Sequence, residues 1–315
     1  MLSLLGDTVN VAGESAVRMT IDELTRWLIG GPKVLDGATG SELLRRGVSA
    51  AGRLWGVGAL LDDPDAVRRL HRDYAAAGAD ALTAATFRVA PYSLRLAGLE
   101  DRTDELASLA IRLAREGGRE AGRDLPVFAS QTTLEDCYRP DLVPDDDTLR
   151  REHAATAAAL AAAGADVLLL ETFNTVREAR IAVEAATATG LPVIVSFTCT
   201  SGGRILSGEG AAEAARAVTL PGVVAAGTNC TAVGEMLPAL TSMSAATSLP
   251  LVAYANNAWY EQDSAFLTAE PVPPDRYGFC ALGWITVGAR LVGGCCGTGP
   301  EHIAALASQV LRRRS

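Results

Sequence analysis

Short apolar segments alternate with longer segments of helical character along most of the chain. Helix signals include Asp63-Pro64 at one start and Ala-Gly-Ala-Asp at two ends, and 148–163 and 275–287 are predicted helices. Such alternation predicts parallel β/α units. The eight predicted strands are 33–38, 80–86, 126–131, 166–171, 192–198, 223–230, 251–256 and 290–296.

Polar residues stand at the C-terminal ends of six of these strands. Residues from so many strands converge only if the sheet closes, which favours a barrel over a doubly wound open sheet with the same alternation. We therefore predict an α/β fold, a single-domain (β/α)8 TIM barrel. The residues concerned are Asp36, Thr86, Glu171, Cys230, Asn256, Cys295 and Cys296.

The domain organisation is simple. Residues 1–17 show no periodicity and are expected to be a loose leader, and 18–315 form the predicted barrel domain. Its first helix begins at Thr20, which forms a capping box with Glu23. We find no linker that would divide the remainder.

The net charge and the hydropathy of the chain exclude several classes of binding partner. The net charge of -9 argues against nucleic acid and against an anionic membrane surface, because both need a basic face. No apolar run approaches the roughly 18 residues of a membrane span. We expect a cytoplasmic protein that acts on small molecules. Thiols stay reduced there, so the six cysteines are expected to be ligands and core residues.

Two adjacent cysteines, Cys295 and Cys296, follow the last predicted strand between glycines. In a regular strand they would point to opposite faces, so they can serve one site only if the backbone departs from strand geometry, as Gly293, Gly294 and Gly297 permit. Cys230 ends the sixth strand at the matching point. Three thiolates predict a Zn²⁺ site with one open position. The alternatives are small core residues or a redox pair.

Two carboxylates, Asp36 and Glu171, end the first and fourth strands. A carboxylate at a buried strand end needs a cation or hydrogen-bond donors. We expect both to hold the ammonium of an amino-acid substrate, while backbone amides near Gly37 and Thr39 bind its carboxylate. The alternative is that the two side chains cap the helices that follow.

The remaining candidates carry weaker signals. His71 and His153 lie on polar faces of predicted helices and are expected at the surface. His302 lies in the first turn of the last predicted helix, after the cysteine pair, and support of the zinc site is the less favoured of its two interpretations. Cys199 is expected to pack beside the site. Cys137 lies in the loop after the third strand, where it is either an exposed thiol or a lid residue.

Five segments together resemble the zinc-dependent homocysteine S-methyltransferases, which include betaine-homocysteine methyltransferase and the homocysteine-binding module of cobalamin-dependent methionine synthase. They span nearly the whole chain in family order, and the cysteine pair is the most specific. The segments are 36–42 (DGATGSE), 71–80 (HRDYAAAGAD), 171–173 (ETF), 227–230 (GTNC) and 293–303 (GGCCGTGPEHI).

The resemblance implies a (β/α)8 barrel in which Cys230, Cys295 and Cys296 bind zinc and activate the thiol of homocysteine. It also implies that Asn256 occupies the open zinc position before substrate arrives, and it places Asn229 among the substrate-binding residues. Methyl transfer then gives methionine.

The methyl donor is open because the chain departs from the family at 85–88, 130–140 and 254–258. A sulfonium, S-methylmethionine or S-adenosylmethionine, is the first expectation and a betaine-like ammonium the second. Trp55, Phe87, Tyr254 and Trp259 are candidates for aromatic faces that attract such cations, and the alternative for each is a core residue. Other hypotheses are methylation of another small thiol or selenol, a non-catalytic zinc-binding barrel, and a phosphate-handling barrel enzyme.

Overall fold

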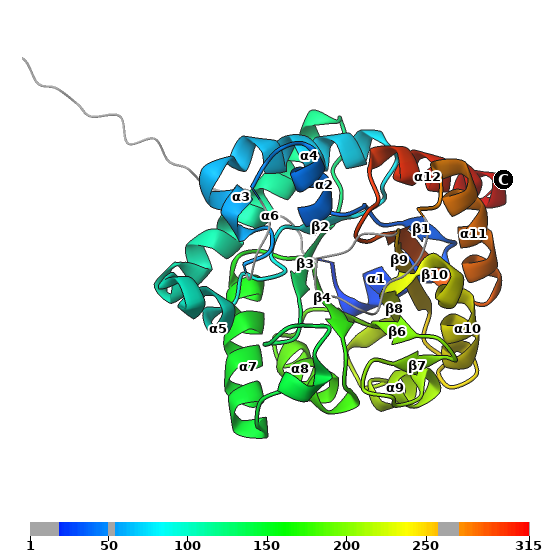
Figure 1. The fold of residues 1–315 in the computed structure, drawn as a ribbon. Helices are drawn as coiled ribbons and strands as arrows, with labels where there is room; N and C mark the ends of the chain where they lie inside the picture. The colour runs from blue at the N-terminus through cyan, green and yellow to red at the C-terminus, as the bar shows by residue number, and fades with distance from the viewer. Residues whose placement is uncertain (1–18, 50–53, 258–270, 315) are drawn as a thin grey trace, which may run out of the picture.

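The computed structural model describes residues 19–49, 54–257 and 271–314, so the predicted leader lies outside the described residues. Within these ranges, eight parallel strands form one sheet in the order β1-β10-β9-β8-β5-β4-β3-β2. A parallel bridge between Leu35, next to β1, and Ala81, next to β2, joins the two ends of this order. The sheet therefore closes into a barrel with helices around it (Figure 1), which confirms the predicted fold.

Every predicted strand is present, although β1 and β2 are shorter than expected. A small antiparallel pair, β6 (Cys199–Thr200) and β7 (Arg204–Ile205), follows the fifth barrel strand. The barrel strands are β1 (Lys33–Val34), β2 (Leu82–Ala84), β3 (Val127–Gln131), β4 (Val167–Phe173), β5 (Val193–Phe197), β8 (Val223–Ala232), β9 (Leu251–Asn256) and β10 (Ala289–Gly294).

The helices follow the signals in the sequence. Thr20 and Glu23 form the predicted capping box, and Asp63 caps the helix that begins at Pro64. The helices are α1 (Ile21–Ile29), α2 (Gly40–Arg45), α3 (Val57–Asp62), α4 (Pro64–Ala76), α5 (Pro91–Leu94), α6 (Thr103–Glu120), α7 (Asp146–Ala162), α8 (Val176–Thr187), α9 (Ala211–Ala217), α10 (Val233–Ser244), α11 (Pro274–Thr286) and α12 (Pro300–Arg314).

Two layers make up most of the hydrophobic core of the described residues. The larger one lies between the strands and the outer helices, and the smaller one fills the inside of the barrel. Helix α1 belongs to the inner layer, because Leu24 and Leu28 pack against barrel residues such as Phe128 and Val167. In Figure 1 this helix lies behind the centre of the ring of strands. It closes the N-terminal end of the barrel, so a ligand reaches the interior from the opposite end.

The prediction that His71 and His153 are surface residues is wrong, because both side chains are fully buried. His71 lies where α4 meets α6, and Gly117 makes room for it: a Cβ on Gly117 would lie 2.8 Å from the Cβ of His71. His153, in α7, lies 3.1 Å from Glu178 of α8. Helix α4 packs against α6 and α7 packs against α8 as well as the sheet, so these two positions are covered.

None of the helices in the described ranges is long and apolar enough to cross a membrane.

Candidate active site

A cavity of about 470 Å³ opens at the C-terminal ends of the barrel strands. Most of the predicted site residues line it, although they come from segments far apart in the sequence. The predicted residues in its wall are Asp36, Gly37, Thr39, Glu171, Cys230, Cys295 and Cys296.

Three cysteine sulfurs form one cluster in this wall. The Sγ atoms of Cys230, Cys295 and Cys296 all lie within 4.8 Å of one another, and those of Cys230 and Cys296 are 3.7 Å apart. A tetrahedral zinc ion with Zn–S distances of about 2.3 Å separates its sulfur ligands by about 3.8 Å. The cluster therefore has the ligand type and the spacing of a three-cysteine metal site.

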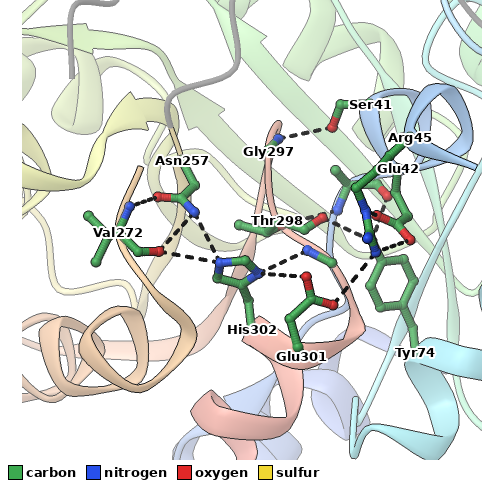
Figure 2. Close-up of polar contacts among 12 residues, drawn as sticks. Ser41, Glu42, Arg45, Tyr74, Asn257, Val272, Gly297, Thr298, Glu301 and His302 are labelled. Atoms are coloured by element: carbon green, nitrogen blue, oxygen red, sulfur yellow. Dashed lines mark hydrogen bonds and ion pairs between the residues drawn. The ribbon is translucent and has the colours of Figure 1, made fainter. Parts of the chain in front are cut away.

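Cys295 and Cys296 reach the cluster because the backbone leaves strand geometry after Gly294. The amide of Thr298 donates to the carbonyl of Cys295 at 3.1 Å, which closes a turn, and Gly297 has a φ of 78°. Figure 2 shows a brace of this turn: the Gly297 amide donates to Ser41 Oγ at 2.9 Å. The departure expected from the glycines is present.

Cys230 is aimed at the cluster by a different device. The pairing of β8 with β9 shifts between Asn229 and Ala232, and Cys230 within this bulge has a φ of 49°. A shift in β4 likewise brackets Glu171, and the next residue, Thr172, has a φ of 63°. Left-handed backbone at residues other than glycine is costly and gathers at functional sites. Both bulges turn a side chain toward the cavity.

The cluster favours one anionic sulfur. Hydrogen bonds from the thiols of Cys295 and Cys296 hold the pKa of the Cys230 thiol well below its usual range. Sharing a proton with Cys230 raises the pKa of the Cys295 and Cys296 thiols. A group of sulfurs that concentrates negative charge in this way attracts a soft metal cation.

The carboxylates form a second group in the cavity. Burial raises the pKa of Asp36 to about 8, although its Oδ2 accepts a hydrogen bond from the Thr83 amide at 2.8 Å. Its Oδ1 has no hydrogen-bond partner among the described residues. Burial also raises the pKa of Glu171 to about 7, and Ser130 donates a hydrogen bond to it.

Neither carboxylate caps a helix, which was the alternative explanation. Thr39 occupies the N-cap position of α2, and Thr175 caps α8. Burial disfavours the ionised forms of both Asp36 and Glu171, and Asp36 Oδ1 is left without a partner among the described residues, so a bound cation would stabilise the ionised pair.

Two predicted asparagines stand behind the cavity wall. Asn229 is fully buried; its Oδ1 accepts hydrogen bonds from the Thr172 amide (2.8 Å) and Ser196 Oγ (2.7 Å), and its Nδ2 lies 3.4 Å from Glu171. Asn256 Nδ2 lies 3.5 Å from the sulfur of Cys230. The side-chain amide of Asn229 thus supports a carboxylate of the cavity, and that of Asn256 supports a sulfur of the cysteine cluster.

His302 braces the cysteine turn from α12. Its Nδ1 accepts a hydrogen bond from the Gly299 amide at 3.1 Å, and its Nε2 lies 3.0 Å from Asn257 Nδ2 (Figure 2). The backbone amide of Asn257 in turn donates to the carbonyl of Cys296 at 2.8 Å. The side-chain Oδ1 of Asn257 accepts a hydrogen bond from the backbone amide of Val272. Burial lowers the pKa of His302, which favours the neutral ring.

The other cysteines and the aromatic candidates divide by location. Cys137 is buried in the cavity wall, so it is not the exposed thiol that was one of its two alternatives. Cys199 is buried in the outer core layer and does not line the cavity. Cys280 is half-buried against the outer core layer. Trp55, Phe87 and Tyr254 line the cavity, and Trp259 lies outside the described residues.

Three residues of the site carried no signal in the sequence. Ser130 contacts Glu171, the Thr83 amide contacts Asp36, and Tyr138 Oη lies 3.1 Å from the sulfur of Cys230. Ser130 and Thr83 belong to predicted strands, but their partners depend on how neighbouring strands are offset. Tyr138 stands in a loop whose path no periodicity predicts.

Known proteins share this combination of barrel and site. A family model described as "Homocysteine S-methyltransferase" matches residues 33–310. Homocysteine S-methyltransferase 4 of Zea mays is 30% identical over 89% of this chain and 90% of its own. Homocysteine S-methyltransferase YbgG of Bacillus subtilis is also 30% identical, over 87% of this chain and 93% of its own.

The comparison with solved structures agrees. The metallated form of the homocysteine methyltransferase MmuM from Escherichia coli superposes with a TM-score of 0.77 at 30% identity, covering 88% of this chain and 96% of that one. A match of the family model over most of the chain, a shared fold and a compatible three-cysteine cluster lead to one conclusion: the chain belongs to the homocysteine S-methyltransferase family.

Proposed function

We propose that the protein transfers a methyl group from a sulfonium donor to the thiol of homocysteine, with Zn²⁺ held by Cys230, Cys295 and Cys296. The observation that carries this proposal is the three-sulfur cluster in the wall of a cavity that also holds two buried carboxylates. The names of the relatives agree with it.

The cluster suits zinc because soft thiolates are preferred ligands of this ion, and three of them leave one position for a substrate. When bound, zinc lowers the pKa of a substrate thiol so that a nucleophilic thiolate is present at neutral pH. The contribution of the chain is to hold the three sulfurs at fixed spacing through the turn after β10 and the bulge in β8.

The carboxylates orient the acceptor. The ammonium of homocysteine donates to Glu171 and to the unpartnered Oδ1 of Asp36, and the carboxylate of homocysteine lies near the backbone of Gly37 and Thr39. A cation there stabilises the ionised forms of both side chains, which burial otherwise disfavours. The amino acid is thereby anchored while its sulfur points toward the cysteine cluster.

The methyl transfer needs no reactant besides the donor and the acceptor. The acceptor sulfur forms a bond to the methyl carbon, the donor carbon–sulfur bond breaks, and its electron pair leaves with the donor as a neutral thioether. The thiol proton passes to solvent. The aromatic faces of Trp55 and Phe87 in the cavity wall attract the cationic donor.

The setting of the protein follows the same reasoning. Both substrates are small molecules that the cavity admits. All six cysteines are free, as expected for the reducing cytoplasm, where we place the protein.

The test combines metal analysis with donor choice. Wild type and Cys296→Ser are assayed for zinc content and for methionine formation from homocysteine, with S-methylmethionine, S-adenosylmethionine and betaine offered separately. We expect about one zinc per chain, turnover with a sulfonium, and loss of both in the variant. Cys280→Ser is the matched control, because Cys280 lies in α11 away from the cluster.

Other outcomes identify the alternatives. Turnover with betaine replaces the donor, and turnover with another thiol or a selenol replaces the acceptor. Zinc without turnover on any acceptor points to a non-catalytic barrel. Protein prepared under reducing conditions that binds no zinc contradicts the proposal.

A further inference from the structure

Tyr138 stands at the cysteine cluster although it comes from a different part of the barrel. It lies in the segment between β3 and the short 3-10 helix at Pro140–Leu142, and its Oη is 3.1 Å from the Sγ of Cys230. A cysteine that binds a metal ion is deprotonated, so its sulfur can only accept. The tyrosine hydroxyl must then be the donor.

The segment that carries Tyr138 is fixed by side chains on both of its flanks. From β2 and the following loop, Arg88 donates to the carbonyls of Thr133 (2.9 Å) and Glu135 (3.1 Å). From the other flank, Asn174 Nδ2 donates to the carbonyl of Cys137 at 3.0 Å. The backbone on the N-terminal side of Tyr138 is therefore set by contacts that do not involve the cysteine cluster.

Three buried polar side chains, linked by hydrogen bonds, hold the start of the same segment. Glu178 accepts a hydrogen bond from the Leu134 amide at 2.9 Å, and His153 Nε2 lies 3.1 Å from the same carboxylate oxygen. Gln131 Nε2 lies 2.9 Å from His153 Nδ1. An amide nitrogen only donates, so Nδ1 accepts and Nε2 carries the proton toward Glu178. Gln131, His153 and Glu178 are at most 2% exposed.

We propose that Tyr138 is a positioning residue for Cys230: its hydroxyl donates a hydrogen bond that fixes the sulfur and withdraws negative charge from it. Cys230 needs such support because its backbone is left-handed within a bulge, and Asn256 Nδ2 at 3.5 Å is the more distant second donor. Hydrogen bonds to metal ligands orient them and adjust the charge they donate. The inference rests on the metal site of the proposed function.

The experiment compares two tyrosine-to-phenylalanine variants. Tyr138→Phe removes the hydroxyl at the sulfur. Tyr92→Phe is the matched control, because its hydroxyl donates to Glu135 Oε1 at 2.6 Å and so bonds the same segment without touching the cluster. Zinc affinity is measured by chelator competition, and the thiolate-to-metal charge-transfer band is recorded for the cobalt-substituted proteins, both without substrate.

We expect Tyr138→Phe to weaken zinc binding by roughly 10–100-fold, the usual effect of losing a hydrogen bond to a metal ligand. Its charge-transfer band should move to lower energy, because a sulfur without the hydrogen bond holds its lone pairs less tightly. Tyr92→Phe should match wild type in both measurements. A structural effect of the segment alone would weaken binding in both variants without moving the band.

Wild-type affinity and an unshifted band in Tyr138→Phe would overturn the inference, and so would equal changes in the two variants. Circular dichroism of each variant establishes that it is folded. Because no acceptor or donor is present, a wild type that fails to methylate homocysteine would contradict the proposed function while leaving this result intact.

Discussion

The two sides of the cavity prepare for positive charge in different ways. On one side, three cysteine sulfurs lie within 4.8 Å of one another, held by a turn and a bulge. On the other, Asp36 and Glu171 are buried strand-end carboxyls whose pKa values burial raises to about 8 and about 7. The sulfurs gather into one anionic cluster, whereas burial favours the protonated form of the two carboxyls.

This difference shows what each side requires from its ligand. A closely spaced group of thiolates is stabilised only by a cation at its centre, which fits a resident metal. A buried carboxyl can instead remain neutral until a cationic group arrives, which fits a substrate that comes and goes. The sulfur side is thus suited to a permanent cation and the carboxyl side to a transient one.

The largest effect should come from the sulfur side. Cys230→Ser removes a thiolate and leaves a weak ligand, so the variant should lose zinc. Without zinc the transition state should lose several kcal/mol of stabilisation, which lowers kcat/KM on the order of 10³-fold. Metal analysis and the methyl-transfer assay check this expectation. Cys199→Ala is the control, because Cys199 is buried in the outer core layer. Full zinc content in Cys230→Ser would show that the cluster does not need this sulfur.

The next effect should come from the carboxylate side and should leave the metal in place. Glu171→Gln removes the charge that we propose holds the substrate ammonium, a charge-assisted hydrogen bond of about 1.5–3 kcal/mol, so KM for homocysteine should rise roughly 10–100-fold. Loss of binding present in both ground and transition states raises KM with little change in kcat. Steady-state kinetics on the zinc-loaded variant measures both constants.

An acceptor without the amino group sharpens this result. With 4-mercaptobutanoate, wild type and Glu171→Gln should have similar KM values, because no ammonium is present to lose. Glu152→Gln is a matched control: Glu152 is a buried carboxylate of α7 that pairs with Arg151 at 3.1 Å. If Glu171→Gln weakens both acceptors equally, Glu171 supports the cavity wall instead of binding the ammonium.

The sequence predicted the site residues that strand periodicity places, but not those that a loop or the packing of two helices places. The eight strands and the cluster of Cys230, Cys295 and Cys296 were predictable, because periodicity and strand ends place them. Tyr138 was not, since a loop held by partners such as Arg88 and Asn174 has no local pattern. The burial of His71 was missed because it depends on how α4 meets α6.

The smallest effect concerns stability and tests whether Asp36 holds its proton in the empty cavity. The carboxyl loses its proton near pH 4 in the unfolded chain and near pH 8 in the folded one. The folded state therefore binds more protons between these values, and the free energy of unfolding falls as pH rises through about 8. Asp36→Asn does not titrate, so it should lack this component of the decline.

Between pH 7 and pH 9, wild type should lose on the order of 1 kcal/mol more than Asp36→Asn, measured by chemical denaturation of proteins with the same metal content. Saturating homocysteine should reduce this difference, because the ammonium stabilises the ionised carboxylate that burial disfavours. Parallel pH profiles without homocysteine would mean that Asp36 is already ionised in the empty cavity. The carboxylate side would then resemble the sulfur side, an anionic site that exists before its cation binds.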